Sequence, residues 1–436
     1  MLCLPKAIKN YNLMGDIYSY VNASLQVFIQ LECVQNWFKQ LMTTGNIYNA
    51  YYNTTLTKDL FLIFDSLSKG MVLDSSKLIL DFNSKCSDIW HKFIGNDPYH
   101  FLHYFLEIIH FENNIPRNPN FDSLLYNQLL INNIHNDYQV FQLFKNYLQQ
   151  TQNSFVTYNF YNQQKYMVVC PLCNSNFSYS IKKIIKFNVD EMLRIRNQLY
   201  PLKFGSNLSL QDCFEISLIG KNNNCQICFN NISNEMQKLY DCSNVLIIAF
   251  NREKHSVNYK GDINFYLDMD ISNFIINKNS DNKFFKLKGV ISRYKRDKYY
   301  ADVFINGQFY RLMDTTNPMQ MDVKMINVNE LKEYEPQVLI YEINYKTKLF
   351  YQMQKFESLK LTLNLIKMMA LNFQLSNIAN QAMLRQNNIN NNPPNMGFNL
   401  KFLCIPQIWD NNEQNAIPIT PQVIPDLTIK ETIDKF

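Results

Sequence analysis

The residues best suited to chemistry are a serine that precedes a helix-like segment and four cysteines arranged in two pairs. Ser19 lies within residues 15–26, Gly-Asp-Ile-Tyr-Ser-Tyr-Val-Asn-Ala-Ser-Leu-Gln, which have the form of a nucleophile turn running into a helix. A hydroxyl held at such a turn becomes a nucleophile when a neighbouring base takes its proton. The chemical question for this chain is therefore whether Ser19 has such a base.

The four cysteines predict a metal site. Cys170 and Cys173 form one Cys-x-x-Cys pair, and Cys225 and Cys228 form the other. Zinc takes four thiolates tetrahedrally, and each pair lets one tight turn supply two ligands. About fifty residues separate the pairs, so we expect the two knuckles at the tips of adjacent hairpins. Unmetallated reduced thiols are the alternative, whereas redox catalysis would require a pair that opens a helix in a βαβ unit.

The elements that must position these residues fall into a helical part followed by a β-rich part. Residues 20–39 and 56–110 carry apolar side chains at helical spacing, and residues 100–110 are the most strongly apolar. From about residue 155 the pattern changes to short β-like runs, which are 155–161, 177–187, 245–250, 285–294, 300–304, 308–313 and 337–345. A helical lobe followed by a mostly antiparallel β region predicts an α+β protein.

The chain divides into four predicted regions. A helical lobe spans 1–150, and a β-rich region that carries the cysteine pairs spans 151–345. A helical extension spans 346–386, and an Asn- and Pro-rich extended tail spans 387–436. Such a tail cannot bury a core alone and becomes ordered when it lies along a partner. We therefore expect a subunit of a larger protein assembly, contacted partly through residues 356–436.

Composition excludes several classes of protein. The 436 residues are 47% hydrophobic, which is ample for a large core, yet hold no run of eighteen apolar residues that predicts a membrane span. The N-terminus lacks the apolar region of a signal peptide, so we expect an intracellular protein. The net charge of +5 is spread along the chain without a run of five basic residues, so nucleic acid is not indicated.

The residue usage bears on the source of the protein. Glycine is scarce, with 10 residues, while Asn, Ile, Lys, Phe and Tyr are abundant, as in proteins of AT-biased genomes. A protist source is our interpretation. The compartment stays open among cytoplasmic, ciliary or cytoskeletal, nuclear and organellar locations.

Taken in order, these features resemble the ubiquitin-specific protease family (peptidase C19) over roughly residues 5–345. The Cys box of that family, Gly-Asn-Thr-Cys-Tyr-x-Asn-(Ala/Ser)-x-Leu-Gln, is matched by Tyr20, Asn22, Ala23, Leu25 and Gln26. Further resemblances are the helical segment Asp97–His110, the two cysteine pairs of the fingers, the strand Val245–Arg252 and the closing strand Pro336–Tyr341. The resemblance implies a papain-like fold with a helical thumb, a β-rich palm and zinc-knuckle fingers, followed here by a C-terminal helix and tail.

The same resemblance places the catalytic positions on unsuitable residues. The catalytic cysteine falls on Ser19, the histidine on Lys298, and the orienting Asp or Asn on Met313, with Asp314 one place later as a poor substitute. None of the six histidines lies after His255, so a registration shift of a few residues cannot restore the base. A Ser–Lys dyad would require a buried, neutral lysine, whereas Lys298 lies in a charged run.

We therefore predict an inactive pseudo-deubiquitinase that serves as a scaffold subunit through protein–protein interaction. A ubiquitin-binding receptor without hydrolase activity is the first alternative, and an active deubiquitinase with an unrecognised nucleophile is the second. His100, His103 and Glu107 share a predicted helix face that could ligate a metal, although packing against the β region explains them more simply. Cys33 and Cys86 are predicted to be packed thiols.

Overall fold

The structure is a computed structural model that divides the chain into two compact units, Met1–Ser358 and Leu359–Phe436. It describes residues 8–9, 18–44, 55–69, 71, 73–90, 97–115, 117, 137–170, 172, 174–203, 207–219, 221–223, 228, 233–252, 262–277, 283–296, 298–313, 323–344 and 367. The predicted helical extension and tail therefore lie outside the described residues, apart from Lys367. All that follows concerns the first unit.

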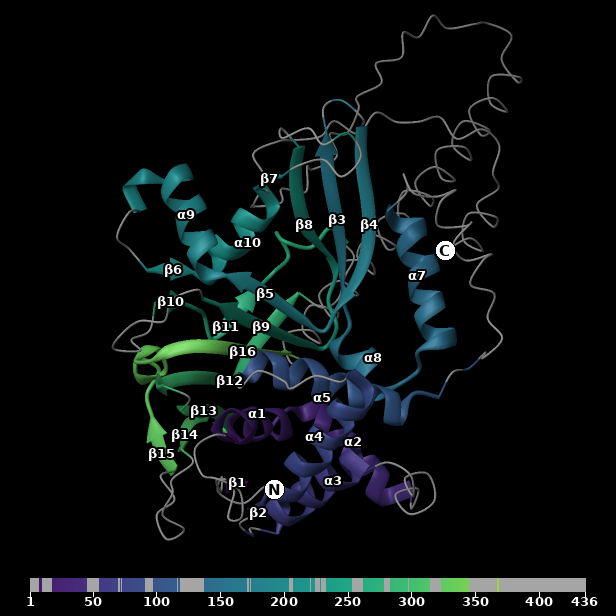
Figure 1. Cartoon of the computed structure of the whole chain (residues 1–436), viewed down its shortest axis with the longest axis vertical. Helices are drawn as coiled ribbons and strands as arrows, with labels where there is room; N and C mark the ends of the chain where they lie inside the picture. The colour runs from purple at the N-terminus through teal and green to yellow at the C-terminus, as the bar shows by residue number, and fades with distance from the viewer. Residues whose placement is uncertain are drawn as a thin grey trace, which may run out of the picture. The chain divides into compact units, whose positions relative to one another are not determined.

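The N-terminal part of this unit is helical, as predicted (Figure 1). Its helices are α1 (Ser19–Ile29), α2 (Glu32–Thr44), α3 (Thr55–Ser68), α4 (Ser76–Trp90), α5 (Pro98–Asn113), α7 (Asp137–Thr151) and α8 (Phe155–Phe160), and the short strands β1 (Ile8–Lys9) and β2 (Leu73–Asp74) pair in parallel. The described part has no helix that is long and apolar enough to cross a membrane.

One helix prediction and one strand prediction need correction. The segment 20–39 is not one helix, because the chain turns at Gln30 and a second helix starts at Glu32. Residues 155–161 are not a strand, because Phe155–Phe160 form α8. The side chain of Ser154 accepts a hydrogen bond from the Thr157 N–H at 3.2 Å, and this N-cap favours helix over the β propensity of the aromatic residues that follow.

The palm is an eight-stranded sheet with the order β15-β14-β13-β12-β16-β9-β5, and β11 also pairs with β12. Its strands are β5 (Ile184–Asn188), β9 (Val245–Asn251), β11 (Asp268–Asp270), β12 (Phe284–Lys295), β13 (Lys298–Ile305), β14 (Gln308–Met313), β15 (Val323–Ile326) and β16 (Glu335–Ile343). The pairing is antiparallel, as predicted, except that β5 runs parallel to β9.

The fingers are a second sheet with the order β4-β3-β8-β7, drawn above the palm in Figure 1. Its antiparallel strands are β3 (Asn162–Cys170), β4 (Asn174–Lys182), β7 (Lys221–Asn223) and β8 (Ser233–Asp241). The segments between the two sheets form α9 (Val189–Leu199), the 3-10 helix η2 (Pro201–Lys203), α10 (Leu210–Ile219) and the paired strands β6 (Leu208–Ser209) and β10 (Ile263–Asn264). A last 3-10 helix, η3 (Glu330–Lys332), precedes β16.

The palm sheet is buried on both faces, and its strands divide their side chains between two cores. Ile247 of β9 and Ile340 of β16 join the core that contains the thumb helices, whereas their neighbours Ile248 and Leu339 join the opposite core. This alternation follows from the two-residue period of a strand. It explains why β9 and β16 are almost continuously apolar.

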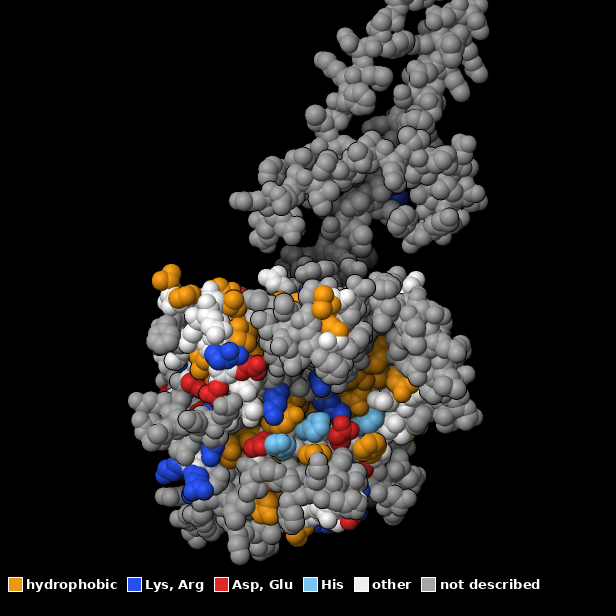
Figure 2. All heavy atoms as spheres, turned by 45° about the horizontal axis from the view of Figure 1, so that its top comes forward, with side chains coloured by type: hydrophobic (Ala, Val, Ile, Leu, Met, Phe, Trp, Pro, Cys, Tyr) orange, Lys and Arg blue, Asp and Glu red, His pale blue; other side chains and the backbone are white. Residues whose placement is uncertain are grey.

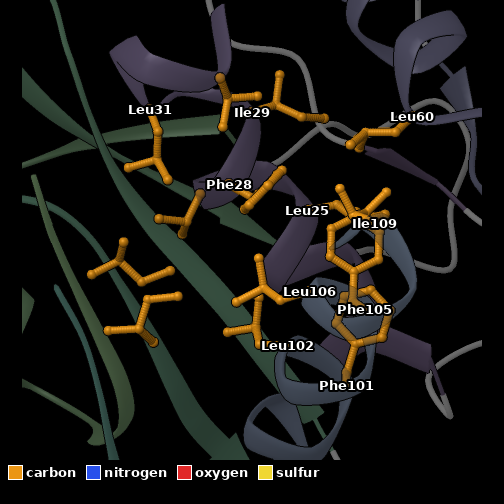
Figure 3. Close-up of a cluster of buried hydrophobic side chains, with 14 of the residues drawn as sticks. Leu25, Phe28, Ile29, Leu31, Leu60, Phe101, Leu102, Phe105, Leu106 and Ile109 are labelled. Atoms are coloured by element: carbon orange, nitrogen blue, oxygen red, sulfur yellow. The ribbon is translucent and has the colours of Figure 1, made fainter. Parts of the chain in front are cut away.

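Helix α1 is the centre of the thumb core (Figure 3). All eleven of its residues are buried, and Leu25 and Phe28 pack with Phe101, Phe105 and neighbouring apolar side chains of α5. The rings of Phe28 and Phe105 meet edge-to-face with centroids 5.3 Å apart. A helix that is buried on every side needs neighbours all round, and here α5 covers one side while β12 and β13 of the palm cover the other.

The approach of α1 to the palm depends on Gly289 of β12. A Cβ atom added at Gly289 would lie 2.3 Å from one γ-methyl of Val27 and 3.1 Å from the carbonyl oxygen of Asp302. A real Cβ contact does not come that close, so any other residue would push α1 away from the sheet. The glycine is therefore required by helix–sheet packing.

We predict that Gly289→Ala destabilises the fold by about 1–3 kcal/mol, because overpacking forces side chains off their rotamers. The measurement is urea unfolding of Gly289→Ala, of Val27→Ala and of the double variant. Removal of the Val27 methyls makes room for the new Cβ, so the double variant should lose less stability than the sum of the single variants, with a coupling of about 1 kcal/mol or more. Additive losses would contradict the close packing of Val27 on Gly289.

Candidate functional site

Ser19 is the first residue of α1, and its position is fixed by the burial of that helix. It is 3% exposed, and its Oγ accepts a hydrogen bond from the backbone N–H of Tyr299 on β13 at 3.1 Å. The ring of the next residue, Tyr20, packs edge-to-face on the Tyr299 ring with centroids 6.4 Å apart. The start of α1 is thus joined to the start of β13 by one hydrogen bond and one aromatic contact.

The three positions of the catalytic triad therefore converge. Lys298 immediately precedes Tyr299 and begins β13, while Met313 ends β14 and lies opposite Tyr300 in the β13–β14 ladder. Asp314 lies outside the described residues. The alignment by resemblance and the geometry agree that Ser19, Lys298 and Met313 mark one place in the fold.

The hydrogen bond that the structure describes for Ser19 Oγ comes from a backbone N–H and not from a basic side chain. A serine nucleophile gives its proton to a nearby base, but the Tyr299 N–H is a donor and cannot take up a proton. The side chains of His100 and Asp97, at the start of α5, are in contact and form a His–Asp pair. That pair lines a groove in which Ser19 is not among the lining residues.

This groove, of about 260 Å³, lies between the thumb and the palm, and Tyr299 is one of its lining residues. Its thumb wall is the start of α5, and its palm wall comes from β5, β9, β12 and β16. The lining residues are Asp97, Pro98, Tyr99, His100, Lys186, Ala249, Phe250, Asn251, Arg252, Arg293, Tyr299 and Gln337. The Lys186 ammonium lies 4.2 Å from the centroid of the Tyr99 ring and so links palm and thumb across the groove.

Gln337 of β16 is the most informative residue of the groove. It is 8% exposed, and its Nε2 is buried without a hydrogen-bond partner among the described residues. Leaving a buried donor unsatisfied costs about 1–3 kcal/mol. A ligand carbonyl or carboxylate in the groove would satisfy it.

Beyond the groove, α5 presents a row of polar side chains to the β region, and Figure 2 shows a row of histidine and acidic side chains with Lys and Arg side chains beside it. Glu107 forms an ion pair with Lys183, which links β4 to β5. His110 is buried, its Nδ1 lies 2.7 Å from Ser154 Oγ, and burial lowers its pKa to about 4. Burial also lowers the pKa of His103. The Glu107–Lys183 pair joins α5 to the β region, and no metal-binding group is found among the described residues.

The fingers bring the two cysteine pairs together as far as the structure describes them. Cys170 ends β3, and Cys228 lies in the turn between β7 and β8, whose strand β8 pairs with β3. Their sulfur atoms are 3.4 Å apart, although 58 residues separate them in the sequence. Cys173 and Cys225 lie outside the described residues. One thiol from each knuckle thus reaches the same point.

Four of the other described cysteines are packed inside the protein, as predicted for Cys33 and Cys86. The thiols of Cys33, Cys86, Cys213 and Cys242 are buried. Burial raises the pKa of Cys86 to about 12, and burial together with the nearby Glu342 carboxylate raises the pKa of Cys33 well above its usual value. Reactivity requires the thiolate, so these groups are inert packing residues.

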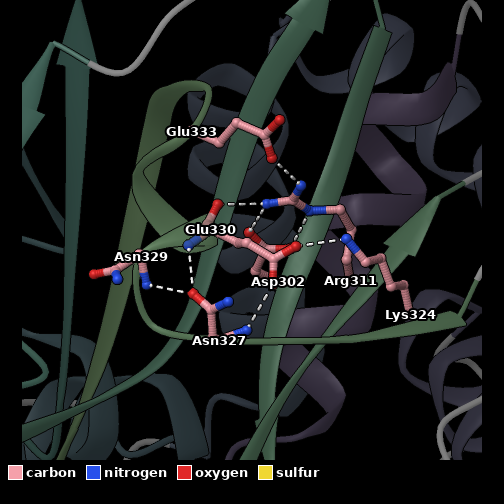
Figure 4. A network of polar contacts seen from close by, with 7 residues as sticks. All are labelled: Asp302, Arg311, Lys324, Asn327, Asn329, Glu330 and Glu333. Carbon is pink, nitrogen blue, oxygen red and sulfur yellow. Dashed lines mark hydrogen bonds and ion pairs between the residues drawn. The ribbon is translucent and has the colours of Figure 1, made fainter.

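The strands that carry Lys298 and Met313 are held by a buried ion pair that the sequence did not reveal (Figure 4). The Arg311 guanidinium donates to both carboxylate oxygens of Asp302, at 2.9 and 3.1 Å, and to Glu333 at 2.9 Å. It also lies 4.4 Å from the centroid of the Tyr300 ring. Burial raises the pKa of Asp302 to about 7 even though Arg311 opposes the shift.

Comparison with known proteins shows the fold. No protein-family model matches the chain, and no curated protein matches it. The yeast SAGA deubiquitinase module, solved with a mutant of its Sgf73 subunit, matches with a TM-score of 0.51 and 15% identity over 78% of this chain and 68% of that chain. The Ubp8–Sgf11–Sgf73–Sus1 module of SAGA matches with a TM-score of 0.51 and 15% identity, over 78% and 67% of the two chains.

A variant of that module bound to monoubiquitin matches with a TM-score of 0.50 and 15% identity, over 78% of this chain and 69% of that chain. At such identities the likeness shows the fold alone. The mixed helix-and-sheet fold expected from the sequence resemblance is thereby confirmed for the described residues, and it matches the ubiquitin-specific-protease-like fold of that module. The zinc knuckles, the C-terminal helix and the tail stay predictions.

Proposed function

We propose that this protein is a non-catalytic, ubiquitin-specific-protease-like subunit of a larger protein assembly, in which it acts by protein–protein interaction. The observation that carries the proposal is the hydrogen bond from the Tyr299 N–H to Ser19 Oγ at 3.1 Å. This bond joins Ser19, at the nucleophile position, to β13, the strand that begins with Lys298 at the base position, and its donor is a backbone N–H. Ser19 is thereby a structural residue at the start of a buried helix.

Three further features support the absence of hydrolysis. The base position holds Lys298, and the orienting position holds Met313, which cannot accept a hydrogen bond from a ring nitrogen as a carboxylate does. The groove between thumb and palm is lined by Tyr299 but not by Ser19, Lys298 or Met313. The buried thiols described above have raised pKa values, so they supply no alternative nucleophile.

The role in an assembly is supported by the structural neighbours, which are subunits of a multiprotein deubiquitinase module. The contribution of residues 356–436 to partner contacts rests on their sequence, since they lie outside the described residues except for Lys367.

We expect the tagged protein, isolated from its source cells, to co-purify with other subunits and to leave ubiquitin conjugates intact. The measurements are size-exclusion chromatography of the isolated complex, labelling with a ubiquitin-based electrophilic probe, and hydrolysis of a ubiquitin–fluorophore amide. No covalent adduct and no release of fluorophore are expected, because the serine lacks a base.

Ser19→Ala serves as the control variant, and any residual signal should be the same in both proteins. A probe adduct that Ser19→Ala abolishes would show that the serine is a nucleophile after all. An adduct on a mapped cysteine would support the unrecognised nucleophile instead, and elution of the protein as an isolated chain would contradict the scaffold role.

We also propose a structural zinc held by Cys170, Cys173, Cys225 and Cys228. The 3.4 Å approach of the Cys170 and Cys228 sulfurs supports it, because thiols from separate knuckles come this close around a shared ion. Zinc would tie the β3–β4 connection to the β7–β8 connection and stabilise the fingers.

The purified protein should contain about one zinc per chain by elemental analysis, because the four thiolates of a closed structural site bind one ion. Cys170→Ser and Cys228→Ser should each release the metal and lower the melting temperature. Cys86→Ala, which removes a buried thiol from α4, should keep the zinc. Metal-free wild-type protein, or zinc that survives Cys170→Ser, would rule out this site.

A ubiquitin-binding receptor without hydrolase activity is the second candidate, and the unsatisfied Nε2 of Gln337 favours it. The groove that this donor lines lies between thumb and palm, and one structural neighbour was solved with monoubiquitin bound. A ubiquitin tail that entered the groove would supply the missing acceptor.

If this candidate is correct, Gln337→Leu should weaken ubiquitin binding about fivefold or more without lowering stability, because it removes a donor that is unsatisfied in the free protein. The measurement is titration of isotope-labelled ubiquitin by NMR. Gln211→Leu, an exposed amide on α10, is the control and should bind as the parent protein does. Absence of shift changes at millimolar protein would eliminate the receptor function.

A further inference from the structure

Strand β5 is the last strand of the palm sheet, next to the fingers (Figure 1). It pairs with β9 from Ile184 to Asn188. Within the described part of the chain, the backbone groups of Ile184–Phe187 that point away from β9 form no hydrogen bond. An unpaired strand edge of this kind is a template for a further strand.

A pocket of about 380 Å³ runs along this edge. Its lining includes all five consecutive residues of β5, Ile184–Asn188. Successive side chains of a strand point to opposite faces, so a pocket on one face would meet every second residue. Contact with all five indicates that the pocket borders the edge of β5, although Lys186 is its one exposed residue.

The other walls suit the side chains of an added strand. Apolar side chains of α9, α10 and β8 form one part, and they are Met192, Ile195, Phe214 and Leu239. Gln164 of β3 and Gln237 of β8 form another part. Gln164 is 8% exposed and lines the pocket. A peptide in the pocket would pair its backbone with β5 and lie within reach of the Gln164 amide.

The charged side chains of the lining favour an acidic partner. Lys182 ends β4, Lys186 lies in the middle of β5, and both side chains are exposed. Glu191, in the first turn of α9, is the single carboxylate among the lining residues that the structure describes. Carboxylates on an incoming strand would meet the two ammonium groups at alternating positions.

We propose that the free edge of β5 accepts an extended segment of a partner protein, in which apolar residues alternate with acidic ones. The segment pairs its backbone with Ile184–Phe187, places apolar side chains between α9 and α10, and directs carboxylates to Lys182 and Lys186. Backbone pairing then gives affinity, and the alternate side chains give specificity. The inference rests on the proposed scaffold function and names the chemistry of one partner.

A random heptapeptide library displayed on phage, selected on the full-length protein, tests the proposal. Enriched sequences should alternate apolar with Asp or Glu residues, and their synthetic peptides should bind. N-methylation of every second backbone amide should weaken binding about tenfold or more in one phase of the alternation and little in the other, because only alternate N–H groups face the neighbouring strand.

Matched tryptophan variants show whether peptides bind in the pocket or elsewhere on α9. Ile195→Trp fills the pocket and should abolish peptide binding, whereas Arg194→Trp places the same side chain on an exposed neighbour outside the lining and should not. Lys182→Glu combined with Lys186→Glu should weaken the acidic peptides about tenfold. Circular dichroism and melting curves show whether each variant is folded.

Several outcomes would overturn the proposal. These are no enrichment, enrichment of basic peptides or of peptides with helical periodicity, equal effects of both N-methylation phases, or peptide binding that survives Ile195→Trp. Competition by monoubiquitin would assign the edge to ubiquitin instead. If these tests fail while the cellular complex still forms, the scaffold function stands without the β5 site; if the protein purifies alone, the scaffold function fails first.

Discussion

The structure depends on one buried carboxylate that joins the thumb to the palm. Glu342 of β16 is fully buried, and its oxygens accept the backbone N–H groups of Glu32 and Cys33 at 2.9 and 2.8 Å. A buried charge is costly unless it is paired and hydrogen-bonded. Here the carboxylate is neutralised by the first N–H groups of α2, which have no carbonyl partner within the helix, and by the ammonium of Lys288, 3.3 Å away. The turn after α1 is thereby fixed to the centre of the sheet.

A second helix is also capped by the carboxylate of a glutamate that is distant in sequence. Glu112, near the end of α5, accepts the N–H groups of Leu56 and Thr57 at the start of α3, at 3.1 and 2.8 Å. In both cases a glutamate distant in sequence replaces the local cap that a helix usually carries. Helices that begin without their own caps are positioned by tertiary contacts, so the thumb acquires its geometry only as the palm and α5 assemble.

The sequence predicted much of the fold but little of the site. Periodicity located β9, β12, β13, β14 and β16 within a few residues, because strands buried on both faces are long apolar runs. It missed the break at Gln30, since the cap of α2 comes from Glu342, and it misassigned α8, where the Ser154 cap opposes the β propensity of aromatic residues. The convergence of Ser19 with the β13–β14 hairpin followed from family resemblance. Gln337 and the β5 edge carry no signal in the sequence, because what marks them is the absence of a hydrogen-bond partner in the folded structure.

The ion pair between Asp302 and Arg311 has a consequence for the history of the hairpin that carries Lys298 and Met313. Loss of either partner alone leaves an uncompensated buried charge, at a cost of about 3–5 kcal/mol. Asp302 and Arg311 can therefore be exchanged only as a pair. A single substitution at either position passes through an unstable protein, so selection on folding preserves the pair whatever residues stand at positions 298 and 313.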